Sequence, residues 1–97
     1  MFTSKQRSNL KSIANAIEPI TQVGKGGIND NLIKSLSDAL EARELIKVSV
    51  LNNVENEVKD IAKELSTKLR AQTVTCIGKK IIIYRKSRRE NFNHIEY

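Results

Sequence analysis

The chain has 97 residues and a mass of 11.0 kDa, with 39% hydrophobic and 29% charged residues. That length suits one compact domain, and the composition excludes a wholly disordered protein. Seventeen Lys and Arg against eleven Asp and Glu give a net charge of +6 and a pI near 9.7, which favours a polyanionic partner, with nucleic acid as the leading class.

Apolar runs in the chain reach only a few residues, far short of the ~20 that span a bilayer, and the N-terminus lacks the apolar stretch of a signal peptide. We therefore expect a soluble, cytoplasmic protein with no membrane contact. A single cysteine, Cys76, excludes an intramolecular disulfide and a zinc knuckle, so no metal or other cofactor is expected.

The N-terminal segment predicts a helix followed by a strand. Thr3 and Gln6 have capping-box spacing, and an apolar stripe with helical periodicity follows at Leu10, Ile13, Ala14 and Ile17. Pro19 lacks an N–H group, so the helix should end near Ile17 and residues 20–23 should continue as a short strand.

A second helix and a second strand are predicted after a glycine cluster. Asn29 has the character of an N-cap, with Ile28 and Ile33 placed as a hydrophobic staple, so the helix should cover about 30–43. Over residues 45–51 the period changes to two, with Ile46, Val48 and Val50 on one face of a strand and Lys47 and Ser49 on the other.

The remaining elements are a helix and a hairpin. An Asn52-Asn53 turn leads to an amphipathic stripe that predicts a helix over about 58–70. Two β-branched runs, 73–77 and 81–85, flank Gly78-Lys79-Lys80 and should pair antiparallel. The expected fold is α/β (α+β), in the order α-β-α-β-α-β-β, with one four-stranded mixed sheet packed against helices.

Little periodicity remains beyond Lys86, so we expect a domain over residues 1–86 and a basic, polar C-terminal tail over 87–97. In this interpretation His94 is solvated, and Glu41 and Glu44 are surface charges at the end of the second helix. Phe92, Ile95 and Tyr97 are the tail residues with the apolar surface to dock on the domain.

Three of the four glycines lie in Gly24-Lys25-Gly26-Gly27, between a strand and a helix. Glycine lets a backbone approach a partner closely, and a following helix N-terminus presents N–H groups that suit phosphate oxygens. The G-x-x-G loop of KH modules clamps a nucleic-acid backbone in this way. The same pattern also occurs as an ordinary turn, and the spacing matches neither a P-loop nor a dinucleotide fingerprint.

Basic residues are unevenly placed. Residues 55–70, the third helix and its approach, hold four acids and four bases, whereas six cations and no acid lie within residues 79–89. We expect the first helix, the glycine loop and the closing hairpin to wall one basic surface. Besides Gly24, Lys25, Gly26 and Gly27, the candidate nucleic-acid-binding residues are Lys5, Arg7, Lys11, Lys34, Lys79, Lys80, Arg85 and Lys86. A basic tail that merely repels other molecules is the alternative.

Catalysis and base stacking both lack candidates. His94 and Cys76 have no evident partner for acid–base or nucleophilic chemistry, so no enzyme and no small-molecule substrate are expected. Only Tyr84 provides an aromatic ring within a predicted strand, whereas sheet-based RNA readers expose several. Backbone and shape contacts therefore fit better than stacking.

Three strings together resemble the bacterial YhbY family of single CRM-domain RNA-binding proteins. They are Pro19-Ile20 through Val23-Gly24-Lys25-Gly26-Gly27, then Leu40-Glu41-Ala42-Arg43-Glu44-Leu45-Ile46-Lys47-Val48, and Gly78-Lys79-Lys80-Ile81-Ile82-Ile83-Tyr84-Arg85. The resemblance covers about 3–85. It implies a fold similar to the C-terminal domain of translation initiation factor three, with RNA binding at the glycine loop.

The resemblance further implies association with precursors of the large ribosomal subunit. We therefore expect a monomeric, non-enzymatic protein that binds structured ribosomal RNA through the glycine loop and a basic surface. The alternatives are a protein-interaction adaptor that uses the hydrophobic edge of the sheet and a duplex-DNA-binding domain. The salt dependence of the affinity distinguishes RNA binding from the adaptor, because an apolar contact should weaken little with salt. Competition with DNA distinguishes RNA binding from duplex-DNA binding.

Overall fold

The computed structural model describes residues 2–51 and 57–97. Helix α1 (Ser4–Ala14) begins at the predicted capping box, in which the Thr3 hydroxyl accepts from the Gln6 N–H and the Gln6 side chain accepts from the Thr3 N–H. The helix ends earlier than expected. Beyond Ala14 the chain tightens into three-residue turns that end at Ile17, with Ile17 N donating to Ala14 O at 3.0 Å.

The other elements follow the predicted order. They are β1 (Thr21–Val23), α2 (Asp30–Arg43), β2 (Leu45–Val50), α3 (Val58–Leu69), β3 (Gln72–Ile77) and β4 (Lys80–Tyr84). The Asn29 side chain caps α2 by accepting from Leu32 N at 2.8 Å. The turn expected at Asn52-Asn53 lies outside the described residues.

The strands form one mixed sheet in the order β1-β2-β4-β3, which confirms the predicted architecture. β1 runs parallel to β2, with Thr21 opposite Val48, and β4 is antiparallel to both β2 and β3. A register irregularity between Thr73 and Thr75 places the buried Val74 on the same face as Ile82.

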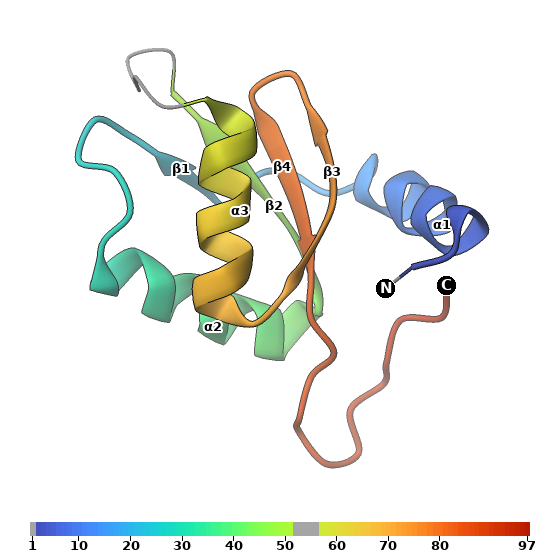
Figure 1. Cartoon of the computed structure of the whole chain (residues 1–97). Coiled ribbons are helices and arrows are strands. Elements are labelled where there is room, and N and C mark those ends of the chain that lie inside the picture. The colour runs from blue at the N-terminus through green and yellow to red at the C-terminus, as the bar shows by residue number, and fades with distance from the viewer. Residues whose placement is uncertain (1, 52–56) are drawn as a thin grey trace.

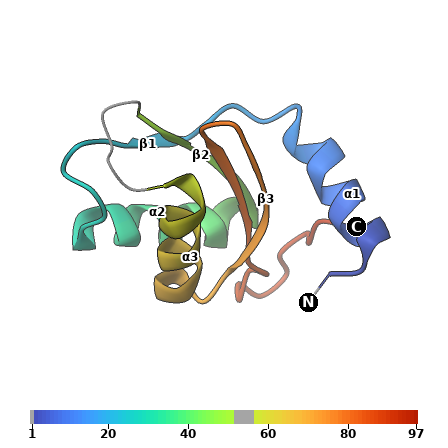
Figure 2. The same ribbon diagram turned by 45° about the horizontal axis from the view of Figure 1, so that its top comes forward.

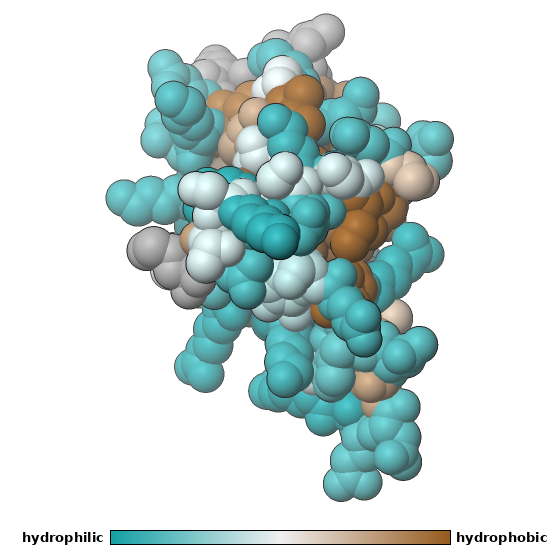
Figure 3. Space-filling view, turned by 90° about the vertical axis from the view of Figure 1, so that its right-hand side faces the viewer, coloured by the Kyte–Doolittle hydropathy of each residue, from teal (hydrophilic) through white to brown (hydrophobic). Residues whose placement is uncertain are grey.

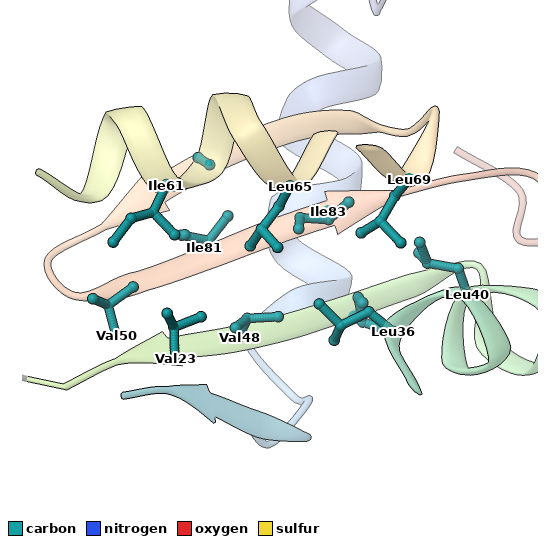
Figure 4. Close-up of a cluster of buried hydrophobic side chains, with 12 residues drawn as sticks. Val23, Leu36, Leu40, Val48, Val50, Ile61, Leu65, Leu69, Ile81 and Ile83 are labelled. Atoms are coloured by element: carbon teal, nitrogen blue, oxygen red, sulfur yellow. The ribbon is translucent and has the colours of Figure 1, made fainter. Parts of the chain in front are cut away.

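Helices cover the two faces of this sheet unequally (Figures 1 and 2). α2 and α3 pack on one face, where Leu36, Leu40 and Leu65 meet alternate strand residues such as Val48 and Ile83 (Figure 4). On the other face α1 buries Leu10 and Ala14 against the intervening strand residues, among them Ile82 and Tyr84. Because strand side chains alternate, one sheet supports both cores.

The C-terminal segment, residues 87–97, is not the loose tail that we expected. Ile95 and Tyr97 pack on the α1 face of the sheet. The Tyr97 ring lies 5.0 Å from that of Tyr84 and 5.7 Å from that of Phe2, in edge-to-face arrangements. The two termini therefore meet on this face (Figure 1), and the segment belongs to the folded domain.

Glu44 anchors this segment. Its side chain is fully buried, contrary to our expectation of a surface charge, and its backbone has a φ of 65° at the end of α2. One carboxylate oxygen accepts from Ser87 N at 2.7 Å and from the His94 ring, and the other accepts from Ile95 N at 2.8 Å. His94 is thus bound to the domain rather than free in solvent.

The pKa of Glu44 reflects this environment. Burial would raise it, but the hydrogen bonds from His94, Ile95 and Ser87, together with the His94 charge, outweigh burial, so the pKa lies below its ordinary value of 4.5. The ionised carboxylate is therefore the form that holds the C-terminal segment in place.

Candidate nucleic-acid interface

The glycine cluster forms a tight turn at the end of β1. Gly27 N donates to Gly24 O at 2.9 Å, which closes the turn, and Gly27 has a φ of 71°. That conformation is strained for residues with a Cβ, so glycine is required at this position for backbone reasons. A Cβ at Gly24 would lie 3.4 Å from the Leu51 side chain, at the near limit of ordinary van der Waals contact, so packing does not by itself require glycine at this position.

The outer part of the turn is open. Lys25 and Gly26 are exposed, and a Cβ added at Gly26 would meet no atom within 4 Å. The backbone here can be approached by a large partner, with the Lys25 ammonium beside it. Asp30 lies in the first turn of α2 and offsets part of the positive end of that helix, so Lys25 is the main local source of positive charge.

The β3–β4 turn lies at the same end of the sheet as the glycine loop (Figures 1 and 2). Strand β2 links the two, because Leu51 N donates to Val23 O at 3.0 Å and Val50 N donates to Lys79 O at 2.7 Å. The two turns are thus separated by one strand, or about 10 Å between their backbones. The structure therefore brings the exposed Lys79 and Lys80 beside the loop.

Other predicted cations lie elsewhere. Lys34 is exposed on α2, one turn after the loop. Lys5, Arg7 and Lys11 are exposed on α1, which lies at the far side of the sheet from the glycine loop (Figures 1 and 2). Hydrophilic residues cover most of the α1 side, with apolar residues in small patches (Figure 3). The cations of α1 therefore lie apart from those of the two turns, and the single wall that we expected from helix, loop and hairpin is not formed.

Arg85 is a structural residue in this fold, in contrast to its predicted place on a basic surface. Its side chain is 15% exposed and donates to Leu69 O at 2.8 Å, Ser37 O at 2.9 Å and Ser37 Oγ at 3.0 Å, with Glu41 3.4 Å away. The guanidinium thus joins α2 to the end of α3. Glu41, partly buried, also accepts from Arg88 N, so it is not simply a surface charge.

Lys86 is exposed, but it follows Tyr84 at the C-terminal end of β4. Lys80 lies at the other end of that strand, where the glycine loop is, so Lys86 is remote from the loop.

Lys47 is a cation that our prediction omitted. It lies in β2 with its side chain on the α1 face, because Ile46 and Val48 on either side point into the other core. The alternation over residues 45–51 already carried that signal.

Within residues 2–51 and 57–97, no three His, Cys, Asp or Glu side chains are grouped so as to hold a metal ion. Cys76 is half-buried beside α3, and burial raises the pKa of its thiol, which disfavours the reactive thiolate. No helix within those ranges has the length and apolar character to cross a membrane.

Comparison with known proteins identifies the family. Residues 2–85 match the model of the CRS1 / YhbY (CRM) domain. The chain is 52% identical over 88 residues to the probable RNA-binding protein YqeI of Bacillus subtilis, covering 91% of this chain and 92% of that protein. It is 31% identical over 92 residues to the probable RNA-binding protein PA4753 of Pseudomonas aeruginosa, covering 95% and 88%.

A solved structure agrees with this match. The solution structure of the hypothetical protein SAV1595 from Staphylococcus aureus superposes with a TM-score of 0.77 at 49% sequence identity, over 94% of this chain and 95% of that one. The family match spans every helix and strand from α1 to β4. This chain therefore belongs to the CRS1/YhbY (CRM) domain family.

Proposed function

We propose that this protein is a non-enzymatic RNA-binding domain that holds structured RNA at the end of the sheet formed by the glycine loop and the β3–β4 turn. The observation that carries the proposal is the open turn at Gly24–Gly27, with Lys25 on it and with Lys79 and Lys80 one strand away. Accessible backbone N–H groups and mobile ammonium groups can donate hydrogen bonds to phosphate oxygens. Relatives named as probable RNA-binding proteins support the same class of partner.

The RNA that we propose is ribosomal, within precursors of the large subunit, as the family resemblance implies. Contacts to backbone and shape suit a folded RNA, because three of the four aromatic rings, those of Phe2, Tyr84 and Tyr97, pack against one another, and the fourth, Phe92, lies beside His94. Co-sedimentation with ribosomal particles from cell extract, followed by crosslinking, tests this assignment. Crosslinks confined to messenger or transfer RNA would contradict it.

Substitutions at Gly26 test the loop itself. Gly26→Asp places a carboxylate in open space and should lower RNA affinity tenfold or more through repulsion of phosphate. Gly26→Ala is the matched control, because it adds the same Cβ without charge and should leave affinity within about twofold. Equal affinity of the Asp variant and the wild type, with both folded, would remove the loop from the RNA site.

Salt dependence separates RNA binding from the adaptor alternative. Each phosphate contact should contribute about 0.7 to 0.9 to the slope of log affinity against log salt. Three lysines at this end of the sheet therefore predict a slope steeper than about −2. A slope near zero would favour an apolar protein partner, for which Ile13, Leu51 and Ile77 are the exposed large apolar side chains among the described residues.

A further inference from the structure

The α1 face of the sheet has an open, polar end that no part of the proposed loop contact uses. Across this end, Gln22 of β1 is in register with Ser49 of β2, and Ser49 is in register with Lys80 of β4. Neighbouring strands place such side chains on one face about 5 Å apart. The result is a row of amide, hydroxyl and ammonium groups beside the glycine loop.

A hollow of about 600 Å³ lies along this row, lined by Pro19, Ile20, Thr21, Gln22 and Ser49. The segment between α1 and β1 forms its outer wall, and Ile20 N donates to Lys47 O at 2.9 Å, which fixes that wall to β2. Gln22 is exposed and Ser49 is half-buried, so both side chains can meet a ligand within the hollow.

Two cations lie next to Ser49. Lys80 lies opposite Ser49, and Lys47 lies two residues before Ser49 on the same face, about 7 Å along the strand. Glu18, the acid that precedes the hollow in sequence, is exposed outside its lining. A groove with neutral hydrogen-bonding groups and lysines beside them matches a sugar–phosphate chain, because the phosphates need the charge and the sugars need the neutral partners.

The hollow is continuous with the glycine loop. Gln22 precedes Gly24 by two residues, and Ser49 is joined through Val50 and Leu51 to both turns at this end of the sheet. A nucleic-acid strand whose phosphates lie on Lys25 can therefore continue across the row. The lining residues include no aromatic ring, so a nucleotide there is held by its edge and sugar rather than by stacking.

We propose that Gln22 and Ser49 hydrogen-bond ribose 2′-hydroxyl groups of the bound strand, which makes this row the feature that selects RNA over DNA. The inference rests on the proposed function and assigns the selectivity to a second part of the same site. An amide and a hydroxyl can each donate to or accept from a 2′-hydroxyl, whereas neither attracts a phosphate as a lysine does. DNA offers no such group, so the two hydrogen bonds are available to RNA alone.

The test compares the affinities of an RNA hairpin and a DNA hairpin of the same sequence for the full-length protein. Gln22→Ala and Ser49→Ala should each weaken RNA binding about three- to tenfold and leave DNA binding unchanged. Lys25→Ala should weaken both alike. Gln72→Ala is the matched control, because Gln72 is exposed on β3, opposite Tyr84 and at the far end of the same sheet.

The outcomes separate this inference from the proposed function. Equal losses for RNA and DNA, or unchanged RNA affinity in both variants with an unaltered thermal midpoint, would overturn the assignment of Gln22 and Ser49 while leaving RNA binding at the loop intact. An RNA preference that the Gln72 variant loses equally would also overturn it. A wild-type protein that binds neither hairpin would overturn the proposed function itself.

Discussion

The buried carboxylate of Glu44 should be coupled to the C-terminal segment, and this coupling can be measured. Glu44→Gln keeps the shape of the side chain but removes its charge and turns an amide N–H₂ toward N–H donors from Ser87, Ile95 or His94. Hydrogen bonds to a charged group contribute about 1.5–3 kcal/mol each when one partner is removed, and an amide retains part of that. We expect a loss of about 2–3 kcal/mol in the free energy of unfolding.

Removal of the C-terminal segment provides the second change of a double-mutant cycle with Glu44→Gln. Truncation after Lys86 deletes all three donors together with the packing of Ile95 and Tyr97, and should cost about 3 kcal/mol or more. In the truncated protein, Glu44→Gln should be neutral or stabilising, because a poorly solvated carboxylate without partners is itself unfavourable. The two changes should therefore be non-additive by about 2 kcal/mol.

Thermal and urea unfolding of the four proteins provide the assay. For a domain of this size, each kcal/mol shifts the midpoint by about 4–8 °C, so Glu44→Gln alone should lower it by roughly 10–20 °C. Additive losses, or a truncated protein with an unchanged midpoint, would refute the reasoning, since both outcomes would mean that residues 87–97 do not engage Glu44 in solution.

Further predictions concern the pH dependence and two other contacts. Because folding lowers the pKa of Glu44, the stability that its ionised carboxylate contributes should be fully present above pH 4.5 and should be lost as the pH falls toward the lowered value. Glu44→Gln should therefore flatten the dependence of stability on pH in that range. An unaltered dependence would contradict this. Arg85→Lys should cost about 2 kcal/mol in urea unfolding but leave the RNA affinity of the folded protein within twofold, whereas a specific loss of affinity would return Arg85 to the RNA site. Gly27→Ala should destabilise by about 1 kcal/mol because of its positive φ, and Gly26→Ala should not; equal midpoints for the two would argue against the turn geometry.

Local signals predicted most of the elements. The bounds of α2 follow from Asn29 as N-cap and from the change of period at Leu45, and the capping box at Thr3 is present as expected. These features depend on residues within a few positions of one another, so the sequence carries them directly. The order of the helices and strands followed from the same local signals, and the family resemblance agreed with it.

Long-range contacts account for what the sequence did not reveal. Glu44 bonds residues 43 to 51 positions away, and Arg85 bonds the backbone of Ser37, 48 positions away. These long-range contacts leave no periodic pattern in the sequence. The sequence therefore indicates surface positions for Glu44 and Arg85, although the fold buries the first carboxylate fully and the second side chain largely. The placement of α1 away from the loop has a similar cause, because an apolar stripe shows that a helix packs on a sheet but not over which part of it.

The central claim is that RNA is bound at the end of the sheet where Lys25 lies, and not by net charge alone. RNA affinity measured for Lys25→Glu and Lys63→Glu over a range of salt tests it most directly, because both changes alter the net charge equally and Lys63 is exposed on α3, away from the loop. The Lys25 variant should lose at least tenfold in affinity and its slope of log affinity against log salt should become shallower by about 0.7 to 0.9, while the Lys63 variant stays within about threefold of wild type. Equal losses in the two variants would contradict the account and show that diffuse charge drives the binding.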